Sequence, residues 1–125
     1  MNFAIVCLIA IIATAPFGLA FLLAPETMGS LYGIASWTPG TLFVGRLLGV
    51  GFLFMAGAAF AARQCADSDF QWRLSICFGI GSLLGAAVSV QSTVSGALNA
   101  LGWSAAALYA FFTLAWASVA VRRRA

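Results

Sequence analysis

Few residues of this chain could do chemistry. Its 125 residues include no histidine and no lysine, and the only carboxylates are Glu26, Asp67 and Asp69. The lack of histidine excludes acid–base catalysis by imidazole and ligation of haem by imidazole, and the lack of lysine excludes Schiff-base chemistry. An enzyme also gathers its acid, base and nucleophile in one place, whereas Glu26 lies far from the other two carboxylates in sequence. We therefore expect no catalytic residues.

The three cysteines predict no metal centre. Cys7, Cys65 and Cys77 are too few and too irregularly spaced for a disulfide framework or a zinc site. Cys7 and Cys77 fall within apolar runs and are expected to pack as small apolar residues. We expect neither a metal nor a cofactor.

The composition predicts a protein that is surrounded by lipid. Hydrophobic residues make up 63% of the chain and charged residues 7%, and the mean hydropathy is +1.05. Globular chains are about one quarter charged, so nine charges cannot cover a soluble surface of this size. The net charge of +3 does not indicate nucleic-acid binding, because the arginines form no basic face with interleaved aromatics.

Four apolar stretches are long enough to cross a bilayer as helices, since about 20 residues span its hydrocarbon core. The predicted fold is therefore an all-α, single-domain bundle of four transmembrane helices over residues 1–125. Pro25 suits the first turn of a further, short helix on the membrane interface between the first two spans, and Glu26 suits its positive end. The predicted spans cover approximately residues 3–23, 41–62, 72–91 and 98–121.

The arginines predict the orientation of these spans. Arg63 and Arg73 flank the second loop and residues 122–124 are all arginine, whereas the first and third loops contain none. The positive-inside rule places the arginine-rich loop and the C-terminus in the cytoplasm. With four spans the N-terminus is then also cytoplasmic, and Glu26 lies on the outer side.

One arginine lies inside a predicted span, and a charge within the membrane is a candidate functional site. Arg46 is about five residues from the start of the second span, close to the outer interface. Its side chain could extend to the headgroups or pair with Glu26, or it could form an anion or headgroup site. Gln91 and Asn99, on the same side of the membrane, could complete a polar ligand-binding or ion-pair cluster with these two residues.

Small residues mark the expected helix contacts, because helices in lipid associate by close packing. On the fourth span we expect Leu101, Leu108, Phe112 and Val119 to face lipid or a partner. The residues predicted to pack helices together are Gly45, Gly49, Gly81, Gly85, Gly102 and Ala106.

Four sequence segments resemble a family of small bacterial inner-membrane proteins of four helices, loosely related to DoxX-like proteins. They are Leu23-Ala24-Pro25-Glu26, Leu31-Tyr32-Gly33, Gly45-Arg46-Leu47-Leu48-Gly49 and residues 97–103. The resemblance implies a four-helix fold and a bacterial inner membrane, and it implies no activity.

The function expected from these features is structural. Small-residue faces without a soluble domain favour a non-catalytic accessory subunit that packs against a larger membrane complex, such as a respiratory or photosynthetic assembly. The expected partners are the lipid bilayer and other membrane subunits or a second copy of the chain, and no nucleic acid or metal. The alternative is a small oligomeric channel or transporter with a polar outer site around Arg46.

Overall fold

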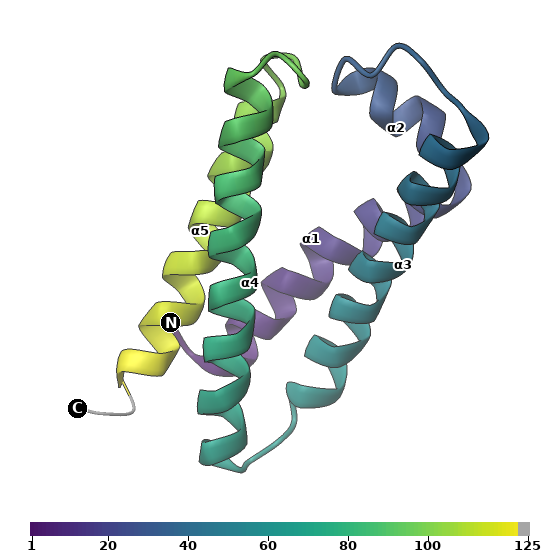
Figure 1. Cartoon of the computed structure of the whole chain (residues 1–125). Helices are drawn as coiled ribbons and strands as arrows, with labels where there is room; N and C mark the ends of the chain where they lie inside the picture. Colours follow the sequence, from purple (N-terminus) through teal and green to yellow (C-terminus); the bar gives the residue numbers. More distant parts are fainter. Residues whose placement is uncertain (123–125) are drawn as a thin grey trace.

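The computed structural model describes residues 1–122, which form five helices and no strand (Figure 1). Four of them are long and apolar enough to cross a membrane, so the chain is a multi-pass membrane protein. The short second helix confirms the one predicted between the first two spans. Arg123 and Arg124, which contribute to the predicted orientation, lie outside the described residues. The helices are α1 (Phe3–Leu23), α2 (Pro25–Leu31), α3 (Pro39–Ala62), α4 (Ser68–Val94) and α5 (Gly102–Arg122).

Local capping sets the start of α3 and α4. At α3, the Oγ1 of Thr38 accepts a hydrogen bond from the Thr41 N–H (3.2 Å), and the Thr41 hydroxyl oxygen accepts one from the Thr38 N–H (2.7 Å). At α4, the carboxylate of Asp67 accepts hydrogen bonds from the N–H groups of Asp69 (2.8 Å) and Phe70 (3.2 Å). Because a cap extends a helix into polar sequence, α4 begins four residues before the predicted span.

The start of α5 differs from the prediction. The segment from residue 98 to residue 101 is a turn: the N–H of Gly102 donates to the carbonyl of Asn99 (2.9 Å), and the N–H of Leu101 donates to the Oδ1 of Asn99 (3.0 Å). Asparagine side chains favour such turns because they bond nearby backbone groups. The predicted span from residue 98 is therefore wrong by one helical turn.

The bundle consists of two helix pairs, α1 with α3 and α4 with α5 (Figure 1). The first pair meets where two glycines face each other. A Cβ atom on Gly49 would lie 2.7 Å from the carbonyl oxygen of Gly18 and 2.6 Å from the backbone nitrogen of Leu22. The absence of side chains here lets the two backbones touch. Gly45 gives space to Pro25 of α2, whose Cβ would lie 2.9 Å from a Cβ at Gly45.

The second pair meets along a row of serines. Ser75, Ser82 and Ser89 are the buried residues of α4, and their spacing of seven keeps them on one face of a helix. Gly85 also lies on this contact, because a Cβ there would come within 2.6 Å of the Tyr109 ring. The prediction that Gly81 packs against another helix is wrong, because its Cβ position has no atom within 4 Å. Gly81 precedes Ser82 by one residue and is therefore turned by about 100° from the helix face that carries the serines.

Gly102 and Ala106, also predicted to pack helices together, are both buried on α5. A side chain at Gly102 would collide with Thr93 of α4.

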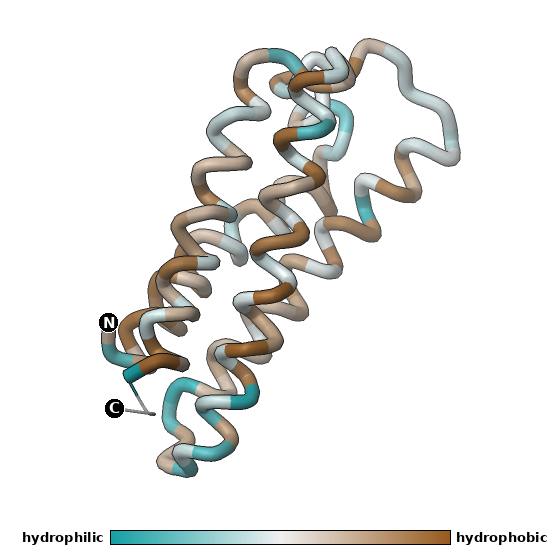
Figure 2. Tube along the Cα trace, turned by 60° about the vertical axis from the view of Figure 1, so that its left-hand side comes forward, coloured by the Kyte–Doolittle hydropathy of each residue, from teal (hydrophilic) through white to brown (hydrophobic). Residues whose placement is uncertain are grey.

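The two pairs join at the end of the molecule that carries the N-terminus, residues 63–67 and the end of α5, hereafter the terminal end. Trp116 (1% exposed) lies at the centre of this core, with its ring 6.1 Å from that of Phe3 and 5.1 Å from that of Phe78. Phe112 is also buried here, so the prediction that it faces lipid or a partner is wrong. Figure 2 shows hydrophilic residues gathered at the two ends of the molecule and apolar residues between them.

Candidate ligand-binding cavity

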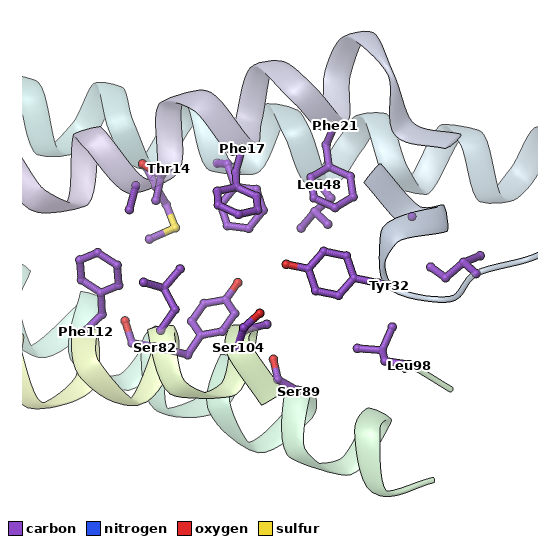
Figure 3. Close-up of a pocket in the computed structure, with 18 residues that line it drawn as sticks. Thr14, Phe17, Phe21, Tyr32, Leu48, Ser82, Ser89, Leu98, Ser104 and Phe112 are labelled. Atoms are coloured by element: carbon purple, nitrogen blue, oxygen red, sulfur yellow. The ribbon is translucent and has the colours of Figure 1, made fainter. Parts of the chain in front are cut away.

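The two pairs diverge toward the opposite end of the molecule, hereafter the α2 end, which carries α2 and residues 32–38 and 95–101 (Figure 1). Contact between the pairs is made mainly by α1 and α5 near the terminal end. The divergence leaves a cavity of about 480 Å³ between them (Figure 3). The residues that line it are Ala13, Thr14, Phe17, Phe21, Gly29, Tyr32, Ile34, Leu48, Phe52, Met55, Ser82, Ser89, Leu98, Ser104, Ala105, Leu108, Tyr109 and Phe112.

Aromatic rings form much of the cavity wall. On the side of α1 and α3, the ring of Phe52 lies 6.4 Å from that of Phe17 and 6.3 Å from that of Phe21. On the side of α5, Tyr109 and Phe112 line the cavity. Gly85 shapes this side, because the lack of a Cβ lets the Tyr109 ring lie directly against the backbone of α4.

The polar atoms of the cavity are neutral, since no charged side chain among the described residues lines it. Some hydroxyls are already used: those of Thr14, Ser89 and Ser104 donate to backbone carbonyls three or four residues earlier, at 2.6–2.8 Å. Within residues 1–122 the hydroxyls of Tyr32, Ser82 and Tyr109 have no hydrogen-bond partner.

These three unused hydroxyls are available to a molecule in the cavity. Their oxygens keep accessible surface, since the Nε1 of Trp37 is the buried side-chain polar atom without a partner among the described residues. The cavity therefore offers an apolar, aromatic surface with a few hydrogen-bonding groups, which is the general character of small-molecule sites.

Asn99 joins the segment after α2 to the segment before α5 at the α2 end of the molecule. Its backbone N–H donates to the carbonyl of Tyr32 (2.9 Å), and its side-chain Nδ2 donates to the carbonyl of Leu31 (2.9 Å). Gly33 permits this approach, because it has a φ of +88° and a Cβ there would lie 3.1 Å from the Cβ of Asn99. The contact holds Tyr32 over the cavity.

Asn99→Ala is expected to lower the free energy of unfolding by about 1–2 kcal/mol, because it removes the side-chain bonds to Leu31 and Leu101. Thermal unfolding in detergent measures this loss. Gln91→Ala is the matched control, since Gln91 is exposed and its side chain has no bond within residues 1–122. Equal stability of the two variants would show that the Asn99 bonds do not hold the two segments together.

The other residues of the predicted polar cluster lie apart from the cavity. Glu26, Arg46 and Gln91 are exposed, and the described residues contain no ion pair between Glu26 and Arg46. The contact between α2 and α3 is made by Pro25 and Gly45. Glu26 and Arg46 each follow one of these residues, so each side chain is turned by about 100° away from the contact. None of the four residues proposed as a cluster lines the cavity, and of them Asn99 bonds to a lining residue, Tyr32.

Sequence reasoning did not identify Tyr32, Ser82 and Tyr109 as site residues. A charge within the membrane indicates a site in a sequence, whereas these three side chains are neutral and come from separate segments of the chain. Their signal is a hydroxyl surrounded by apolar residues, which is too common in membrane helices to select three positions. Among the described residues there is also no group of three or more histidine, cysteine or acidic side chains that could hold a metal ion.

Comparison with family models, with curated proteins and with solved structures gives no match to this chain.

Proposed function

We propose that this chain is a non-catalytic integral membrane protein that binds an uncharged hydrophobic molecule taken from the bilayer. The observation that supports this function is the cavity of about 480 Å³ between the helix pairs. Its volume falls within the range of about 300–1,000 Å³ that is usual for small-molecule pockets. Because the pairs diverge within the apolar part of the molecule, the ligand would enter from the side, through lipid.

The test is to purify the protein in mild detergent and identify the bound molecule by native mass spectrometry. Ala105→Trp fills the cavity, because Ala105 lines it, and should remove the bound molecule. Ala107→Trp is the matched control, since Ala107 lies on the same helix but is exposed and outside the cavity. Equal ligand content in both variants would refute the proposal.

A second candidate function is that of an accessory subunit of a larger membrane complex. It is favoured by α3, where Gly57 and Ala61 are exposed at a spacing of four and the Cβ position of Gly57 has no neighbour within 4 Å. Such a face accepts another helix at short distance. If the chain is a subunit, larger proteins should co-purify with it, and Gly57→Leu should release them.

A channel through a single chain is disfavoured by the core at the terminal end. Val6, Cys7 and Trp116 are at most 1% exposed there, so the two pairs pack closely at this end. The channel alternative would therefore require a pore between chains, and an ion-flux assay in liposomes tests it.

We also propose a bacterial inner-membrane location with both termini in the cytoplasm, on the basis of the arginine distribution and the DoxX-like resemblance. A reporter fused after Ala125 is expected to show cytoplasmic activity, and one inserted at Ser36, in the loop of the α2 end, is expected to show periplasmic activity. The reverse pattern would invert the orientation.

A further inference from the structure

Three cavity hydroxyls define where the polar part of a ligand would lie. Tyr32 reaches the cavity from the α2 end, Ser82 from α4 and Tyr109 from α5; Figure 3 shows the oxygens of Tyr32 and Ser82 directed into it. Ser82 does not bond to its own helix, although Ser75 and Ser89, one heptad before and after it, both do. Ser82 is 3% exposed as a residue, but its oxygen is not among the fully buried atoms that lack a partner, so the hydroxyl is accessible from the cavity that it lines. A polar group of a ligand would supply the missing partner.

The charge and chemistry of the cavity restrict this polar group. No charged side chain of the described residues lines the cavity, so a charged ligand would be buried without a counterion, which is strongly unfavourable. Each hydroxyl can donate a hydrogen bond. The complementary group is a neutral acceptor, and a carbonyl oxygen fulfils this requirement.

The shape of the apolar surface restricts the rest of the ligand. Phe17 and Phe52 lie on one side of the cavity, and Tyr109 and Phe112 lie on the other. Aromatic side chains on two sides favour a flat ring, because rings gain from stacked or edge-to-face contact beyond the area that they bury.

We propose that the cavity binds a planar, uncharged ring that carries carbonyl oxygens, which is the chemistry of the quinones. The hydroxyls of Ser82, Tyr109 and Tyr32 donate to the carbonyl oxygens, and the phenylalanine rings contact the ring faces and edges. The proposal concerns binding alone, and it rests on the proposed function of the cavity.

Two probes of the same shape test this specificity. The first is 2,3-dimethyl-1,4-naphthoquinone, whose substituted ring carbons resist addition of the thiols of Cys65 and Cys77. The second is 2,3-dimethylnaphthalene, which has the same rings but no oxygen. Equilibrium dialysis against the full chain in lipid nanodiscs measures the affinity for each probe.

Ser82→Ala and Tyr109→Phe are each expected to weaken binding of the quinone about three- to tenfold, as the loss of one hydrogen bond does. Neither should change binding of the hydrocarbon. Ser75→Ala is the matched control, because its hydroxyl is buried on the same helix but bonds to the carbonyl of Gln71 (2.7 Å) outside the cavity. Tyr32→Phe provides a further variant if either of the first two fails to fold, as judged by circular dichroism.

The outcomes separate the two proposals. If the variants bind both probes as the wild type does, or if the wild type binds them equally, the carbonyl specificity is wrong and the cavity holds a hydrocarbon such as a lipid acyl chain. If Ala105→Trp binds both probes as the wild type does, the cavity is not the binding site and the proposed function fails as well.

Discussion

Gly49→Leu is expected to separate α1 from α3 and to cause a large loss of stability. The new side chain would meet the backbone of Gly18 and Leu22 at less than 3 Å, and backbone atoms cannot move aside as the end of a flexible side chain can. Overpacking usually costs about 1–3 kcal/mol and occasionally more, so we expect a loss of at least about 3 kcal/mol. Thermal unfolding in nanodiscs, followed by circular dichroism, measures it.

Gly51→Leu is the control for this substitution. Gly51 lies half a turn further along the same helix, and its Cβ position has no atom within 4 Å. Leucine also has a higher helix propensity than glycine, so this variant should be as stable as the wild type or slightly more stable. If both variants lose the same stability, the close contact of α1 and α3 at Gly49 is wrong.

Trp116→Ala is expected to detach the two helix pairs from each other at the terminal end. The indole contacts Phe3 of α1 and Phe78 of α4, and it is 1% exposed. Removing a buried tryptophan typically costs about 3–5 kcal/mol, because a cavity remains that the neighbours fill only in part.

Cys7 reports on this detachment, since it lies in the same core and is 0% exposed. In a background with Cys65→Ser and Cys77→Ser, Cys7 should resist maleimide labelling in the otherwise native chain and react readily in the Trp116→Ala variant. Trp103→Ala, at a position that is 51% exposed, should leave Cys7 protected. Protection of Cys7 in both variants would show that the indole does not hold the pairs together.

The spans could be predicted from the sequence because hydropathy alone decides which segments can enter a bilayer. The first span, residues 3–23, and the short helix that begins at Pro25 are confirmed. The errors lie where polar side chains control the helix ends. Asp67 extends α4 into polar sequence, and Asn99 delays α5 by forming a turn.

The helix that each small residue contacts could not be predicted. A glycine indicates that another segment can approach closely, but it does not indicate which segment does so. Gly81 and Gly85 look equivalent in sequence, yet only Gly85 lies against α5. The cavity depends on this same missing information, since it exists only because the two pairs meet at one end and diverge at the other. That Tyr32, Ser82 and Tyr109 line the same cavity is known only once the arrangement of the two pairs is known.

The division into two pairs also bears on how the chain enters the membrane during synthesis. All the close contacts between α1 and α3 lie within the first half of the chain, and those between α4 and α5 lie within the second. Each pair is therefore a short-range unit of the kind that assembles quickly. The pair α1 and α3 can pack together before the ribosome has synthesised α4 and α5. The two pairs can therefore assemble in the order in which they are synthesised.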